Sequence, residues 1–236
     1  HAGTEDLKKE ILRSAEKLSD VLKYTSMRTP LSVLYKAPSE WMRAVADIKI
    51  DLLHEIITDD CAIYEELQQH LKELYGEQYF TAVNLKLYED PMLPLKKLYS
   101  LEAKLSEALH KKVWLKSGGF LIIEPTEALV AIDVNTGKTT KKGSREETFL
   151  LTNKEAAKEI SKQLRLRNLS GIILVDFINM SDPKNQRELM TFLAEEIKKD
   201  SVKTQLHGMT TLGLVEITRM KVRQPLYEQI KVADKA

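Results

Sequence analysis

Two short apolar runs, each leading to an aspartate, most strongly limit how this chain can fold. Residues 128–132 (ALVAI) precede Asp133, and residues 171–175 (GIILV) precede Asp176. Each run is too short for a typical globular helix and is rich in branched side chains. The pattern therefore predicts two buried strands.

The segment between the two runs predicts a helix. Thr152 or Asn153 can cap its first turn. Ala156, Ile160 and Leu164 then recur every four residues and form one apolar face. A strand, a crossover helix and a second strand predict two strands of the same sheet, joined by a right-handed connection.

Both aspartates are expected near the carboxyl ends of their strands, where open α/β sheets usually bind ligands. Asn135 lies two residues after Asp133 and offers a neutral oxygen at the same edge. An aspartate after a strand is often only a turn residue or a helix cap. The pair of carboxylates nevertheless favours a site for Mg²⁺, which prefers one or two carboxylates together with waters and phosphate oxygens.

Helices and short strands are also expected along the rest of the chain. The whole sequence therefore predicts a mixed α/β fold of the α+β type. Asp59 and Asp60 follow one of these strands, and we expect strand-end and capping roles for them rather than a metal site. One helix is expected to begin at Pro94 and to direct five leucines, at 95, 98, 101, 105 and 109, toward a core. The other expected helices cover 4–24, 39–48, 63–75 and a segment from 182, and the other expected strands cover 31–35, 53–58, 81–87, 113–116, 120–123, 202–206 and 212–218.

Composition narrows the functional classes. With 43% hydrophobic and 30% charged residues the chain is typical of a soluble globular protein. The net charge of +1 gives no bulk attraction to nucleic acid, so such binding would have to come from local clusters. Without an apolar run of about 18 residues, no membrane span is expected. Cys61, the single cysteine, is expected to be packed, and it fits a reducing, cytoplasmic compartment.

Five motifs in the central stretch carry a specific resemblance. They are T-E-A-L at 126–129, I-D-V-N-T-G at 132–137, T-N-K-E-A-A-K-E-I at 152–160, Q-L-R-L-R at 163–167 and V-D-F-I-N-M at 175–180. In order and spacing they resemble the catalytic region of the ribonuclease E/G family. Weaker similarity extends through S-G-G at 117–119 and L-G-L-V-E-I-T-R at 212–219.

The resemblance implies metal-dependent endonucleolytic cleavage of single-stranded RNA, which leaves a 5′-phosphate and a 3′-hydroxyl. Asp133 and Asp176 match the family's metal-binding aspartates, and Mg²⁺ is the expected cofactor. Asn135 matches the asparagine that orients the first carboxylate. Asn179 departs from the family pattern, because many members have aspartate at this position. The missing charge puts in doubt a supporting role for this residue around the metal, and leaves the two principal ligands unaffected.

A basic loop follows the first aspartate. Lys138, Lys141, Lys142 and Arg145 lie within eight residues and have no acidic residue among them. Such a run is usually a solvated loop, but its position beside Asp133 favours contact with RNA phosphates. A second basic cluster comprises residues 219, 221 and 223, and Phe149 is expected to be buried rather than to stack on a base.

The resemblance also implies a domain organisation. Residues 1–30 would be a remnant of a 5′-sensing domain, 31–110 a ribonuclease-H-like subdomain, 111–228 a DNase-I-like catalytic subdomain with a mixed sheet, and 229–236 a tail. Family members carry an upstream RNA-binding barrel, an Arg-Thr pair that holds the 5′-phosphate, and often a downstream Cys-x-x-Cys zinc link between subunits. This sequence matches none of these, so a fragment or short form without the zinc link is expected, and a homo-oligomer is an expectation for the full-length protein.

Two alternatives stay open at this point. The chain could be a non-catalytic RNA-binding fragment that is inactive without the N-terminal domain. It could also be a different Mg²⁺-dependent phosphotransfer enzyme of the α/β type. That enzyme would bind a small phosphorylated ligand and would have no special use for the Q-L-R-L-R helix.

Overall fold

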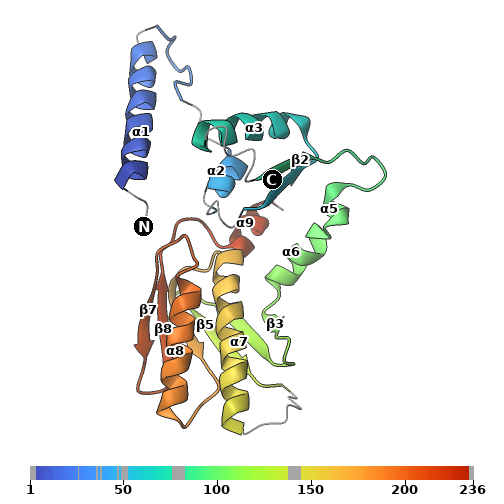
Figure 1. Ribbon diagram of the computed structural model, residues 1–236, viewed down its shortest axis with the longest axis vertical. Helices are drawn as coiled ribbons and strands as arrows, with labels where there is room; N and C mark the ends of the chain where they lie inside the picture. Colours follow the sequence, from blue (N-terminus) through green and yellow to red (C-terminus); the bar gives the residue numbers. More distant parts are fainter. Residues whose placement is uncertain are drawn as a thin grey trace.

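The computed structural model describes residues 4–25, 27–35, 37, 39–46, 48, 53–75, 83–137 and 145–233. These residues form a mixed α/β structure (Figure 1). Its helices are α1 (Thr4–Thr25), α2 (Glu40–Ala46), α3 (Cys61–Tyr75), α5 (Leu95–Leu98), α6 (Leu101–Leu109), α7 (Arg145–Leu166), α8 (Pro183–Ile197) and α9 (Leu226–Ala233). Its strands are β1 (Glu55–Thr58), β2 (Asn84–Leu87), β3 (Lys112–Trp114), β4 (Phe120–Pro125), β5 (Leu129–Asn135), β6 (Gly171–Asp176), β7 (Thr204–Met209) and β8 (Leu214–Arg219).

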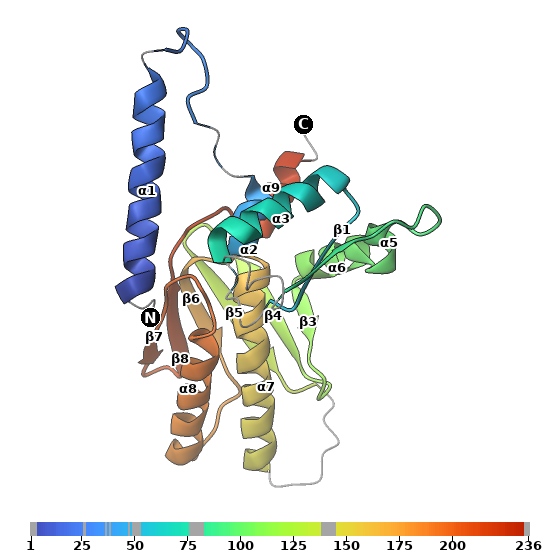
Figure 2. The same cartoon turned by 45° about the horizontal axis from the view of Figure 1, so that its top comes forward.

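The larger sheet has six strands in the order β3-β4-β5-β6-β8-β7. Its central pair, β5 and β6, is parallel, and the other neighbouring strands are antiparallel. Helix α7 connects the parallel pair, which confirms the predicted strand–helix–strand unit. Helices α7 and α8 lie side by side over one face of this sheet, as both views show (Figure 2).

Alternation along the strands gives this sheet one buried and one exposed face. Val130, Ile132 and Val134 of β5 point into the core, as do Ile173 and Val175 of β6. Each fully buried side chain of this size stabilises the fold by about 1.5–3 kcal/mol. The residues between them are largely solvent-exposed, a pattern that antiparallel and mixed sheets tolerate on one side. We call this exposed side the open face.

The helix side of the core follows the predicted periodicity. Ala156, Ile160 and Leu164 of α7 are fully buried. Helix α8 buries the expected residues 189, 193 and 197. It begins as predicted, because the Asp182 carboxylate accepts a hydrogen bond from the Lys184 amide at 2.8 Å and proline occupies the first helical position.

A smaller sheet contains the parallel strands β1 and β2, with α3 packed against them. The Asp60 carboxylate accepts hydrogen bonds from the amides of Ala62 and Ile63 at 2.8 and 3.0 Å. Its expected capping role is therefore confirmed. The expected burial of Cys61 is wrong, because this residue occupies the exposed first position of α3.

Several other expectations for the N-terminal half need correction. The expected leucine-rich helix is two helices, α5 and α6, because Ser100 between them adopts a left-handed conformation with φ of 51°. The leucines at 98, 101, 105 and 109 are exposed rather than packed in a core. No strand forms in the described residues 31–35.

The terminal helices differ from expectation in other ways. Helix α1 forms as predicted, but the apolar side chains of Leu7, Ile11, Leu18 and Leu22 are exposed. Helix α9 crosses the expected boundary between residues 228 and 229. Among the described residues, no helix combines the length and apolar character that crossing a bilayer requires.

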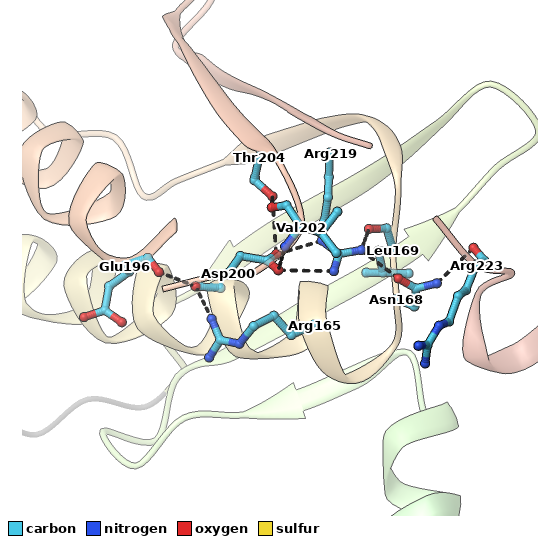
Figure 3. A network of polar contacts seen from close by, with 10 residues as sticks. Arg165, Asn168, Leu169, Glu196, Asp200, Val202, Thr204, Arg219 and Arg223 are labelled. Atoms are coloured by element: carbon cyan, nitrogen blue, oxygen red, sulfur yellow. Dashed lines mark hydrogen bonds and ion pairs between the residues drawn. The ribbon is translucent and has the colours of Figure 1, made fainter. Parts of the chain in front are cut away.

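A buried ion pair ties the end of β8 to the turn that precedes β7 (Figure 3). The Arg219 guanidinium donates to Asp200 at 2.8 Å, and both side chains are only 3% exposed. The same guanidinium donates to the Asn168 side chain at 2.8 Å and to the Leu169 carbonyl at 3.1 Å. Arg219 therefore does not belong to an exposed basic cluster, contrary to the expectation for residues 219–223.

The ionisation of Asp200 is coupled to this pair. Burial alone would raise the pKa of Asp200. Hydrogen bonds from Arg219, the Val202 amide and the Thr204 hydroxyl outweigh burial and lower the pKa of this carboxyl group below its ordinary value. A carboxyl group whose pKa is lower in the folded state stabilises the fold above its unfolded pKa, and this stability is lost as the pH falls through the folded pKa.

We therefore expect Asp200→Asn to lower the free energy of unfolding at pH 7 by about 3–5 kcal/mol, because it leaves the Arg219 charge buried without a counter-charge. Below about pH 4, the ordinary pKa of aspartate, the gap between wild type and variant should begin to narrow, and it should close as the pH falls through the lower pKa of Asp200 in the folded state. Urea denaturation between pH 7 and pH 2 measures both effects. The control is Glu188→Gln, which removes a partly exposed pair with Lys154 and should change the free energy of unfolding far less than Asp200→Asn does. An equal loss in both variants at pH 7 would contradict this account.

Candidate active site

Asp133 and Asp176 lie directly opposite each other on the parallel strands β5 and β6. Registered partners on neighbouring strands have backbones about 4.8 Å apart and project their side chains to the same face. Both side chains are exposed on the open face, while Val134 and Val175 beside them point into the core. Asp176 ends β6, and Asp133 is two residues from the end of β5, so the structure brings the two predicted carboxylates together.

Asn135 reaches the first of these carboxylates. Its side-chain amide donates a hydrogen bond to Asp133 Oδ2 at 2.6 Å. The two residues are separated by one position in the strand, so their side chains lie on the same face. This contact restrains the orientation of the Asp133 carboxylate relative to Asp176.

The predicted basic loop is described only in part. Lys138, Lys141 and Lys142 lie outside the described residues. Arg145 begins α7, and its guanidinium lies 5.3 Å from the centre of the Phe149 ring. Phe149 is partly buried and packs against the core, so the expectation of burial is borne out in part.

Helix α7 begins seven residues before the predicted cap, so the two candidate cap residues lie inside the helix. Thr152 and Asn153 are buried within this helix, so the expected capping role is wrong. Asn153 instead donates to the Ile178 carbonyl at 2.8 Å and accepts from the Ile178 amide at 3.0 Å. The loop after Asp176 is thereby fixed to the helix.

The same helix also fixes the hairpin between β3 and β4. The Glu155 carboxylate accepts a hydrogen bond from the Ser117 amide, with both oxygens at 3.2 Å. The hairpin turn in turn packs against the segment that follows Asp133. A Cβ atom on Gly119 would lie 2.7 Å from the Asn135 carbonyl oxygen, and one on Gly137, whose φ is +58°, would lie 2.1 Å from the Gly118 carbonyl oxygen. Only glycine permits both approaches.

Other polar side chains of the open face lie farther from the aspartates. Glu216 of β8 is exposed opposite Leu174 of β6. His207 lies within β7 rather than between strands, and its Nε2 is 2.7 Å from the Thr218 hydroxyl. Sequence reasoning did not select Glu216, and its only signal was the alternation of exposed and buried residues in β8.

The arrangement suits a hard cation. It offers two exposed carboxylates and an amide that restrains one of them. In the part of the chain that the structure describes, no group of three or more His, Cys, Asp or Glu side chains forms a metal cage. Two carboxylates are nevertheless the number that Mg²⁺ commonly takes from protein, with waters and phosphate oxygens as the remaining ligands. The residues present therefore fit Mg²⁺ better than a metal that needs an all-protein cage.

The contact between Asn153 and Ile178 yields a prediction. Asn153→Ala should lower the free energy of unfolding by about 1–3 kcal/mol, because it leaves the amide and carbonyl of Ile178 without their side-chain partner. Amide hydrogen exchange in the 177–182 segment should accelerate. Asn84→Ala is the control, since that exposed side chain bonds the exposed Glu55 and its loss should change stability by less than about 0.5 kcal/mol. Unchanged exchange in 177–182 would show that Asn153 does not hold this loop.

Comparison with known proteins places the chain in a family. The model of the Ribonuclease E/G family matches residues 1–222. Ribonuclease E of Nostoc sp. is 39% identical over 176 residues, which cover 75% of this chain and 26% of that protein. Ribonuclease E of Haemophilus influenzae is 35% identical over 210 residues, covering 89% of this chain and 22% of that protein.

Ribonuclease G of Haemophilus influenzae is 38% identical over 206 residues, covering 87% of this chain and 41% of that protein. The chain thus spans between about a fifth and two-fifths of the length of these relatives. The match over residues 1–222 includes Asp133, Asn135 and Asp176. The chain belongs to the ribonuclease E/G family.

Proposed function

We propose that the open face carries the site of a Mg²⁺-dependent endoribonuclease, which hydrolyses single-stranded RNA to products with 5′-phosphate and 3′-hydroxyl ends. The observation that carries this proposal is the registered pair of Asp133 and Asp176, with Asn135 bonded to Asp133. The relatives are named ribonuclease E and ribonuclease G. The proposal includes a ribonuclease-H-like subdomain at 31–110 and a DNase-I-like one at 111–228, which the two separate sheets support.

In this proposal each side chain has a distinct role. Asp133 and Asp176 hold the cation through their exposed carboxylates. Asn135 keeps the Asp133 carboxylate turned toward its partner. When bound, Mg²⁺ would polarise the scissile phosphate and lower the pKa of a coordinated water. No side chain needs to supply the nucleophile, and His207 is engaged with Thr218 on a different strand.

The substrate class follows from the accessibility of the face. Asp133 and Asp176 lie on an exposed sheet surface rather than in a narrow cavity. A single strand can splay its unstacked bases over such a surface, whereas a duplex keeps its bases stacked inside. In the sequence, Lys138, Lys141, Lys142 and Arg145 come after the end of β5. We assign them to phosphate contacts because the net charge of +1 supplies no general attraction.

The first test is cleavage of a 5′-phosphorylated, A/U-rich single-stranded RNA with Mg²⁺ or with EDTA. Internal cuts should require Mg²⁺ and should leave 3′-hydroxyl ends that a poly(A) polymerase can extend. Asp133→Asn and Asp176→Asn should each lower the cleavage rate by at least about 100-fold, and Asn135→Ala by about 10- to 100-fold, the usual effect of losing a partner of a metal ligand.

Glu216→Gln is the matched control for this test. It removes one exposed carboxylate from the same face and should leave the cleavage rate within about twofold of wild type. Salt-sensitive binding of the RNA without any cleavage would favour a non-catalytic RNA-binding fragment. Cleavage that persists in EDTA would overturn the assignment of a metal site.

The basic loop makes a separate prediction about salt. Replacing Lys138, Lys141 and Lys142 together by glutamine should weaken RNA binding. It should also reduce the slope of log K against log salt concentration by about 0.7 for each RNA phosphate that the loop no longer neutralises. The control carries the same charge change at Lys96, Lys97 and Lys104, three exposed lysines of α5 and α6. RNA binding is measured by fluorescence anisotropy between roughly 50 and 300 mM salt, and the salt dependence should differ between the two variants. Equal slopes would contradict a role for the loop.

A further inference from the structure

An aromatic cluster lies at the β3 edge of the open face. It comprises Lys112, Trp114 and Phe120. The two rings meet edge to face, with centroids 5.4 Å apart and planes inclined at 64°. Lys112 Nζ lies 3.9 Å from the Trp114 ring centre and 3.8 Å from the Phe120 ring centre. The ammonium group therefore sits between the two rings.

Strand register places this cluster beside the proposed metal site. Trp114 is opposite Phe120, and Phe120 is opposite Asn135. In the next row, Lys112 is opposite Ile122, which is opposite Asp133. All of these side chains project to the open face, because Leu121 and Ile123 between them are buried in the core. Two strand spacings separate Lys112 from Asp133, or about 10 Å.

Packing alone does not account for Trp114. Its side chain is 64% exposed, although tryptophan is among the most buried residues on average. An edge strand usually presents charged or small residues to solvent rather than a large ring. Contacts with Phe120 and Lys112 restrain the Trp114 ring. An exposed ring that is already restrained loses little entropy when a ligand stacks on it.

We propose that the aromatic cluster is a stacking site for a nucleobase of the RNA, about one or two nucleotides from the phosphate held at Asp133 and Asp176. This inference rests on the proposed function. The face is continuous from the carboxylates to Trp114, so a strand bound at one reaches the other. A nucleobase matches a single indole ring in size and shape, and the positive charge of Lys112 complements the RNA backbone.

The site would contribute affinity and position the strand rather than take part in bond breaking. Stacking on an aromatic ring accepts every base, because each base has a π face. It therefore adds binding energy with little sequence readout. Lys112 stabilises the ring but does not provide the stacking surface, so its replacement should weaken RNA binding less than the loss of Trp114 does.

The test measures RNA binding in EDTA, so that it does not depend on cleavage. Wild type, Trp114→Ala and Trp114→Phe are each titrated with an A/U-rich single-stranded RNA. They are also titrated with a series of RNAs that carry one abasic site at successive positions. Trp114→Ala should weaken binding of the intact RNA about tenfold, and Trp114→Phe should restore most of the affinity. Tyr24→Ala, which removes an exposed ring from α1, should bind as wild type does.

The base that stacks on Trp114 is identified by combining the abasic RNAs with the Trp114→Ala variant. If ring and base are in contact, the effects of removing each are not additive. One abasic position should weaken binding to wild type about tenfold, yet have no further effect on Trp114→Ala. In a Trp41→Phe background, Trp114 is the only tryptophan. Its fluorescence should be quenched by intact RNA and not by the RNA that is abasic at that position. Additive effects at every position, or wild-type affinity of Trp114→Ala, would overturn the inference.

The outcomes separate this inference from the proposed function. Asp133→Asn should abolish cleavage in Mg²⁺ and retain the fluorescence quenching in EDTA. Trp114→Ala should retain Mg²⁺-dependent cleavage with a raised KM and an unchanged kcat at saturating RNA. If Trp114 and one base show non-additive effects but the wild type does not cleave RNA, only the proposed nuclease activity is overturned. If the wild type cleaves RNA but all effects are additive, only the stacking site is overturned. Absence of RNA binding in the wild type would overturn both.

Discussion

The register of the parallel pair β5 and β6 is the constraint on which the rest of the structure depends. Side chains alternate between faces, so the register that buries Val175 also places Asp176 on the open face opposite Asp133. A slip of one residue would turn the carboxylate of Asp176 into the core beneath α7. Burying an unpaired carboxylate is far more costly than exposing one apolar side chain. Core packing and the geometry of the site are thus fixed by the same set of backbone hydrogen bonds.

Helix α7 converts this register into a restrained site. Its apolar stripe packs on the buried face, while its N-terminal half extends beyond the sheet and contacts the two loops that frame the carboxylates. Asn153 and Glu155, adjacent to that stripe, hold the loop after Asp176 and the hairpin turn at Ser117 respectively. Because one rigid helix holds both loops, their relative position follows from the packing of the helix on the sheet.

Sequence periodicity predicted the β5–α7–β6 unit well, because its apolar residues recur with the period of a strand or a helix and must be buried on one side. The runs before Asp133 and Asp176 are strands, and Ala156, Ile160 and Leu164 form the buried helical face. Local signals failed where tertiary contacts decide the role of a polar residue. Asn153 has the chemistry of a helix cap, but its amide bonds a distant backbone segment instead. The register of β5 and β6 and the hydrogen bond from Asn135 to Asp133 could not be predicted in detail. Periodicity shows which face a side chain occupies, but not which residue lies opposite it or which group it bonds.

Burial also determines what a cationic side chain can do, and position in the sequence does not. Arg219 lies in a basic stretch, yet it is committed to Asp200 inside the fold and cannot contact a phosphate without leaving that carboxylate buried and unpaired. Lys112 lies in an ordinary edge strand, yet its ammonium group is held against two rings on the face that carries Asp133. Under the proposed function, Lys112 is therefore better placed to meet RNA than Arg219 is. Under the proposed function, a bound RNA strand would run across the open face from the carboxylates of Asp133 and Asp176 toward the edge at β3.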